Sequence, residues 1–129
     1  MRLLLDTHSA LWMFAGSAEI SEDLQKDLTD PENEVFFSDA SAWEIVIKHA
    51  LGKLLLPAPP EIFVPEMVGR HGLEQQPITW NVIFEWGKLP FIHRDPFDRL
   101  LVSQAREEGF LLVSRDTEIC QYEVAVHWR

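Results

Sequence analysis

The sequence predicts an α/β protein with a mostly parallel sheet and helices on both faces of that sheet. Two short apolar runs, residues 3–5 and 110–113, lack the alternation of a half-exposed strand. Such runs are typical of strands buried on both faces of a parallel sheet. Stretches with helical spacing of apolar residues separate the strand candidates, and this alternation favours the α/β class. Because no repeat, low-complexity segment or internal linker interrupts the pattern, residues 1–129 are expected to form a single domain.

The first half of the chain alternates between the two kinds of element. After the strand at residues 3–5, a helix is expected to end near Gly16, and a second helix begins at Ser21. Residues 34–37 form the next strand. A helix over residues 40–51 follows, for which Ser38-Asp39 provides an N-cap.

The second half continues the alternation with less regular elements. A helix begins at Pro60, and the polar residues 73–78 form a weak strand near an edge of the sheet. Thr79 caps a helix that ends near Gly87. After the strand at residues 110–113, a last strand is expected at residues 124–126.

The helix that follows residue 95 has a strongly charged beginning. Asp95 is its N-cap candidate, Pro96 falls at the first helical position, and Asp98 lies in the first turn, at the positive end of the helix dipole. Arg99 is expected to form an ordinary ion pair with a neighbouring acid. Three basic residues crowd the two aspartates, and they are His93, Arg94 and Arg99.

Composition limits the classes of function. With 21 acidic and 11 basic residues the formal net charge is -10, which argues against sequence-independent adhesion to nucleic acid or anionic lipid. Cys120 is the only cysteine, so no internal disulfide can form and a reducing compartment is expected. No apolar run approaches the length of a membrane span or of a signal-peptide core. These features predict a cytoplasmic protein that does not bind membranes.

Three acids occupy positions that are unusual for surface residues. Asp6 and Asp116 each follow a buried strand, at the sheet edge where ligands of parallel sheets bind. Each could instead cap the helix or turn that follows. Glu44 lies on a helix that is apolar around most of its circumference, although a simple ion pair with Lys48 is the competing interpretation.

A fourth acid completes a candidate metal site. If Asp6, Glu44, Asp98 and Asp116 converge, their like charges are unfavourable unless a cation lies between them. Carboxylate oxygens without cysteine favour Mg²⁺ or Mn²⁺ over zinc. Carboxylate-held divalent ions are common in phosphodiester hydrolysis, where they activate water and stabilise developing charge. Neighbouring cations that could contact a phosphate are Lys48, Arg94, Arg99 and Arg115.

Two other classes of function compete with this hypothesis. A zinc hydrolase would need paired histidine spacing, which the chain lacks, so each histidine is expected to be an ordinary core or surface residue. The histidines are His8, His49, His71, His93 and His127. A non-catalytic protein-interaction module on a nuclease fold is the second alternative, and loss of one acid would have favoured it.

The motifs resemble those of the PIN-domain ribonucleases, and within them the VapC-type toxins of bacterial toxin–antitoxin pairs. The likeness extends over nearly the full chain. It rests on Asp6-Thr7-His8 with Leu11-Trp12, on Ser41-Ala42-Trp43-Glu44-Ile45 through Lys48 and Gly52-Lys53-Leu54, on Leu89-Pro90 with His93 to Leu101, and on Leu112-Val113-Ser114-Arg115-Asp116.

The resemblance implies a PIN-like three-layer α/β/α sandwich with endoribonuclease activity that depends on Mg²⁺ or Mn²⁺. It implies that Asp6, Glu44, Asp98 and Asp116 are the metal-binding catalytic acids, and a role for Asp95 beyond capping is left open. Ser114 stands where many relatives have threonine, a change that keeps the hydroxyl. The resemblance also implies RNA as the substrate, a homodimer, and a cognate antitoxin whose C-terminal segment docks near the active site. The strong negative charge and five tryptophans suit a basic, amphipathic partner of this kind, although the tryptophans may equally be core.

Overall fold

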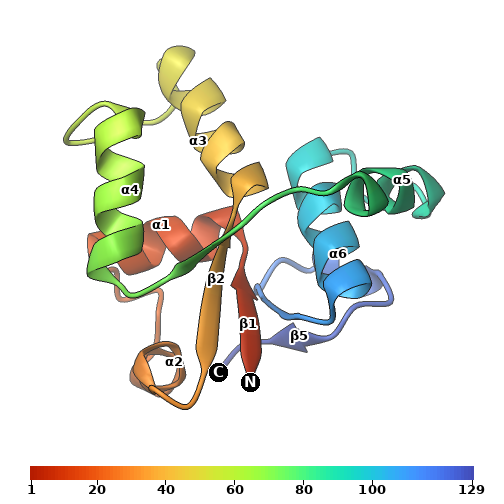
Figure 1. The fold of residues 1–129 in the computed structure, drawn as a ribbon, viewed down its shortest axis with the longest axis horizontal. Coiled ribbons are helices and arrows are strands. Elements are labelled where there is room, and N and C mark those ends of the chain that lie inside the picture. The colour runs from red at the N-terminus through yellow and green to blue at the C-terminus, as the bar shows by residue number, and fades with distance from the viewer.

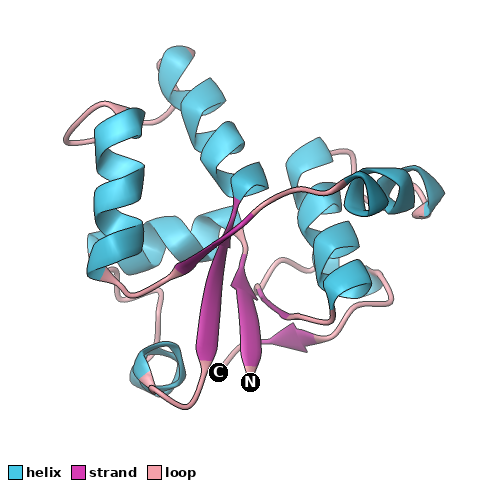
Figure 2. Ribbon diagram, in the orientation of Figure 1, coloured by secondary structure: helices cyan, strands magenta, loops and turns pink.

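A five-stranded sheet lies at the centre of a three-layer α/β/α sandwich (Figures 1 and 2). The computed structural model describes residues 1–129. The strand order is β3-β2-β1-β4-β5, and every pair of neighbours is parallel. The expected α/β class is therefore confirmed, and the sheet is wholly rather than mostly parallel. The strands are β1 (Arg2–Leu5), β2 (Glu34–Ser38), β3 (Glu74–Gln76), β4 (Leu111–Val113) and β5 (Val126–His127).

Six α-helices connect and cover the strands. Asp6, Ser21, Ser38, Thr79 and Asp95 each accept a backbone hydrogen bond as the N-cap of a helix. These caps satisfy amide groups that lack a partner in the first helical turn. The helices are α1 (Thr7–Ala15), α2 (Glu22–Thr29), α3 (Asp39–Ala50), α4 (Pro60–Arg70), α5 (Trp80–Lys88) and α6 (Pro96–Glu108), with a short 3₁₀ helix η1 (Ile119–Gln121).

Two apolar clusters fill the spaces on either side of the sheet. Because side chains alternate along a strand, Leu3 and Leu5 of β1 face one cluster while Leu4 faces the other. The first cluster packs the sheet against α1 and α2, and the second packs it against α6. Figure 1 shows α1, α2 and α4 on one side of the sheet and α5 and α6 on the other. This double coverage explains why the central strands read as unbroken apolar runs.

The peripheral strands differ from the central ones. β3 lies at an edge of the sheet, as its polar sequence predicts. β5 covers Val126–His127 rather than residues 124–126, because it pairs with β4 in the register Leu112↔Val126. No helix of the structure has the length and apolar character needed to cross a membrane.

Arg99 has a structural role that the sequence did not predict. Its side chain is 1% exposed and forms no ion pair. Its guanidinium donates to the carbonyl oxygens of Trp86 and Pro90, each at 2.8 Å, and to Tyr122 Oη at 3.2 Å. Arg99 therefore joins α6 to carbonyl groups at and beyond the end of α5, where the helix dipole also favours a positive charge. The expected ordinary ion pair is wrong.

Candidate metal centre

The candidate site forms at the edge of the sheet where β1 and β4 end. These strands are neighbours, with Leu5 opposite Val113, and the Asp6 amide donates to the carbonyl oxygen of Val113 at 3.1 Å. The residues that directly follow each strand are therefore adjacent. Glu44 on α3 and Asp6 after β1 both lie close enough to Asp98, at the start of α6, for their negative charges to raise its pKa.

Asp6 combines a capping role with a buried charge. Its Oδ1 accepts a hydrogen bond from the Ser9 amide at 2.8 Å, so the capping interpretation is correct for one of its oxygens. Burial of the carboxylate raises its pKa above 3.8, because the ionised form loses its hydration. Hydrogen bonds from the side chains of Ser114 and Ser9 partly oppose this increase. Ser114 is itself buried beside the site, and its Oγ accepts from the Asp116 amide at 3.1 Å.

Glu44 is only 3% exposed and has one unsatisfied oxygen. Its Oε2 lies 2.6 Å from Lys48 Nζ, so the predicted ion pair is present. Its Oε1 is buried and has no hydrogen-bond partner. A buried polar oxygen without a partner costs about 1–3 kcal/mol, and more when the group is charged. A cation near Oε1 would remove that cost.

The carboxylate of Asp98 is also unfavourable in its ionised form. The Asp98 side chain is 15% exposed, and burial together with the negative charges of Asp95, Glu44 and Asp6 raises its pKa from 3.8 to about 7. His93 acts in the opposite direction. Asp95 is the N-cap of α6, as predicted, with Oδ1 accepting from the amides of Phe97 at 2.8 Å and Asp98 at 3.2 Å. Mutual repulsion of this kind is what a divalent cation would relieve.

His93, expected to be an ordinary core or surface histidine, lies among the acids. Its Nε2 is 2.9 Å from Asp98 Oδ2 and 4.0 Å from Asp116 Oδ2, and its Nδ1 is 2.9 Å from Glu118 Oε2. Asp116 Oδ1 caps the following turn by accepting from the amides of Glu118 at 2.8 Å and Ile119 at 3.2 Å. Its second oxygen is therefore the one that faces His93. The sequence analysis placed His93 beside Asp95 and Asp98 but did not include His93 or Glu118 among the site residues, and the available signal was their position within five residues of a predicted acid.

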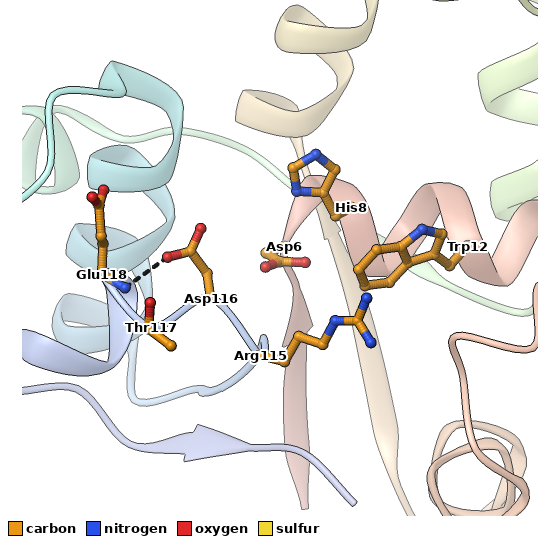
Figure 3. Close-up of a pocket in the computed structure, with 7 residues that line it drawn as sticks. All are labelled: Asp6, His8, Trp12, Arg115, Asp116, Thr117 and Glu118. Atoms are coloured by element: carbon orange, nitrogen blue, oxygen red, sulfur yellow. Dashed lines mark hydrogen bonds between the residues drawn. The ribbon is translucent and has the colours of Figure 1, made fainter.

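A pocket of about 470 Å³ opens beside these acids (Figure 3). Figure 3 shows the carboxylates of Asp6 and Asp116 within it, with Trp12 and Arg115 on one side. Arg115 lies 4.4 Å from the Trp12 ring centre and pairs with Glu19 at 2.5 Å. The lining residues are Asp6, His8, Trp12, Arg115, Asp116, Thr117 and Glu118.

The predicted cations are not all at the site. Arg115 lines the pocket and Lys48 pairs with Glu44. Arg94 is exposed, and the ion pairs at these acids do not include it.

The donor set fits a divalent cation. The ligand atoms of His93, Asp98 and Asp116 lie within 4.8 Å of one another. Asp6 and Glu44 lie outside this tight trio but close enough to raise the pKa of Asp98. Oxygen atoms predominate, and the unsatisfied Glu44 Oε1 is the buried group that most needs a positive partner.

Residues 3–125 match the model of the family described as "PIN domain". The chain belongs to the PIN domain family. Among curated proteins, Ribonuclease VapC16 of Mycobacterium tuberculosis is 38% identical to this PIN domain over 56 residues. That match covers 43% of this chain and only 40% of the relative, so it spans less than half the length of either protein.

Solved structures with the same fold cover nearly the whole PIN domain. VapBC2 from Rickettsia felis, bound to a promoter DNA fragment, has a TM-score of 0.71 and 17% identity, covering 98% of this chain and 96% of that one. DNA-bound VapBC from Salmonella typhimurium has a TM-score of 0.68 and 14% identity with the same coverage. At these identities the likeness establishes the fold.

Proposed function

We propose that this protein is a divalent-metal-dependent endoribonuclease and the toxin of a toxin–antitoxin pair. One observation carries the proposal. Acids from separate elements meet at one edge of a parallel sheet, where Glu44 keeps a buried oxygen without a partner and Asp98 has its pKa raised to about 7. An arrangement of acids that is unfavourable without a cation is the one expected of a site that binds one.

Asp6, Glu44, Asp98 and Asp116 are the residues that would hold Mg²⁺ or Mn²⁺. The bound ion would supply an activated water and stabilise charge on the phosphate and the leaving oxygen. Capping hydrogen bonds fix one oxygen each of Asp6 and Asp116, so both carboxylates are held in place before a ligand arrives. Lys48 holds Glu44 in place through its contact of 2.6 Å.

Groups that suit RNA lie next to the acids. His8 and Trp12 line the pocket and stack with ring centres 5.8 Å apart. Aromatic rings of this kind can stack with unpaired bases, which is how proteins commonly bind single-stranded RNA. Arg115 supplies the guanidinium of the pocket and can contact a phosphate. The name of the relative VapC16, a ribonuclease, supports RNA as the substrate.

Protein partners are part of the same proposal. The name VapBC of both similar solved structures denotes a complex, and we expect this chain to bind a cognate antitoxin in the same way. Large apolar side chains of α3 and α5 are exposed, among them Trp43, Trp80 and Phe84. Such a face is typical of a protein-binding surface and is available for an antitoxin or for the expected homodimer.

The test is cleavage of a fluorescent RNA by the purified protein with Mg²⁺ or Mn²⁺, with EDTA as a control. Asp98→Asn should abolish cleavage, and sequencing of RNA ends after expression would identify the target. If the protein binds an antitoxin but cleaves no RNA with either ion, the proposal is wrong and the non-catalytic interaction module is the better account.

A further inference from the structure

His93 is the one nitrogen donor among the oxygen ligands of the candidate site. We propose that His93 Nε2 binds the metal ion directly, and that this nitrogen makes the site prefer Mn²⁺ to Mg²⁺. The inference rests on the proposed function for the existence of a metal site. Its content is the identity of a further ligand and the resulting choice of ion.

The two nitrogens of the His93 ring contact different partners. Nδ1 lies 2.9 Å from Glu118 Oε2 and 3.3 Å from the Asp95 amide. Nδ1 therefore contacts Glu118, and Nε2 is the nitrogen next to Asp98 and Asp116. A carboxylate that orients a metal-binding histidine through its other nitrogen is a common arrangement in proteins.

Nε2 lies next to carboxylate oxygens of two of the candidate metal-binding acids, Asp98 and Asp116. Around an octahedral ion with bonds of about 2.1 Å, adjacent ligand atoms lie about 3.0 Å apart and opposite ones about 4.2 Å apart. The distances from Nε2 to Asp98 Oδ2 and Asp116 Oδ2 are 2.9 and 4.0 Å. They match an adjacent and an opposite pair of ligands.

The ring is held in place from outside the site. The His93 amide donates to Tyr122 Oη at 2.9 Å, and the same oxygen accepts from Arg99 at 3.2 Å. Tyr122 and Arg99 are both buried. The position of His93 is therefore fixed by the core as well as by attraction to the acids.

A second observation, independent of these distances, also indicates a cation here. Glu44 Oε1 is buried without a partner, and Glu44 is close enough to Asp98 to contribute to its raised pKa. The site therefore contains an unsatisfied oxygen as well as the histidine–aspartate contact.

The nitrogen ligand determines which ion is favoured. Mg²⁺ strongly prefers oxygen ligands, whereas first-row transition ions accept imidazole readily. A site with several carboxylates and one imidazole should therefore bind Mn²⁺ more tightly than Mg²⁺. Replacing His93 by glutamine, whose ligand atom is an oxygen, should reduce that preference.

The test uses the full chain loaded with Mn²⁺ alone and examined by electron spin-echo envelope modulation. Wild-type protein should show modulation from a directly bound ¹⁴N nucleus. His93→Gln should lose it, and the affinity for Mn²⁺ should fall on the order of tenfold while that for Mg²⁺ changes much less. The matched control is His8→Gln, because His8 is exposed on the adjoining pocket and should not affect the signal.

Each outcome decides a different claim. Bound Mn²⁺ without ¹⁴N modulation, in a protein that still cleaves RNA, would overturn the role of His93 and leave the proposed function intact. Loss of the signal in His8→Gln would assign the nitrogen to His8 instead, even if His93→Gln does not fold. Failure of the wild-type protein both to bind Mn²⁺ and to cleave RNA would overturn the metal site together with the function.

Discussion

Replacing Asp98 by asparagine should stabilise the metal-free protein, because the ionised carboxylate is unfavourable where it lies. Its pKa is raised from 3.8 to about 7, mainly by burial and then by neighbouring acids. About three pKa units at about 1.4 kcal/mol each correspond to a cost on the order of 4 kcal/mol for the ionised group. Loss of the contact of 2.9 Å with His93 offsets part of the gain. We therefore expect the free energy of unfolding to rise by roughly 1–3 kcal/mol at pH 7.5.

The stabilisation should depend on pH in a defined direction. Between pH 3.8 and about 7 the folded protein keeps a proton on Asp98 that the unfolded chain has released. The wild-type free energy of unfolding must therefore lose this contribution as the pH rises through that window. Near and below pH 3.8 the carboxyl group is neutral in both states, so the advantage of Asp98→Asn should be small at pH 4.5 and nearly complete at pH 7.5.

The assay is urea unfolding of both proteins in EDTA at pH 4.5 and pH 7.5, followed by tryptophan fluorescence. The control is Asp23→Asn, since Asp23 is 65% exposed, lies 4.0 Å from Lys26 and should have little effect at either pH. Mn²⁺ should then raise the melting temperature of wild type more than that of Asp98→Asn, by mass action. An Asp98→Asn protein that is less stable than wild type by the same amount at both pH values would refute the electrostatic account.

Further predictions concern individual residues. Asp6→Asn should keep the capping hydrogen bond from the Ser9 amide, because an asparagine side-chain oxygen also accepts. The variant should leave the metal-free protein as stable as wild type or more stable, and it should abolish RNA cleavage. A destabilised variant with full activity would show that Asp6 is a structural cap only. Arg99→Met should lower the free energy of unfolding by about 3 kcal/mol in chemical denaturation, because several buried carbonyl oxygens lose their donor. An unchanged free energy of unfolding would show that water can replace the guanidinium as the donor to these carbonyl oxygens. Gly109→Ala should lower the free energy of unfolding by about 1 kcal/mol in the same measurement, since φ is +74° at this position and alanine rarely adopts it. An unchanged free energy of unfolding would mean that the backbone of the turn changes its conformation to accept alanine.

Most secondary structure could be predicted because its causes are local. The N-caps at Asp95 and Thr79 depend on a side chain reaching amides within three residues, and such contacts follow from sequence order alone. The burial of residues 3–5 is visible as an apolar run for the same reason. The bounds of the short strand β5 were predicted less accurately, since they depend on its pairing with β4 rather than on its own residues.

The chemistry at the candidate site was only partly accessible. The convergence of Asp6 and Asp116 follows from the rule that parallel strands end at one edge, and both residues do line one pocket. For both Asp6 and Glu44, the simple structural role and the proposed metal-binding role are compatible. Asp6 caps a helix with one oxygen, and Glu44 forms its ion pair with one oxygen, so in neither case does the simple role use the whole carboxylate.

The sequence by itself determined which acids exist, which elements carry them and the order of those elements, because caps, apolar runs and strand ends are properties of neighbouring residues. Only the tertiary structure decided that His93 contacts Asp98 and Glu118, that Glu44 keeps an unpaired oxygen, and that Arg99 is buried under α5. These contacts depend on how α3, α5, α6 and the segment after β4 pack together. Burial and charge then act over a few ångströms between segments far apart in the chain, and no local pattern encodes those distances.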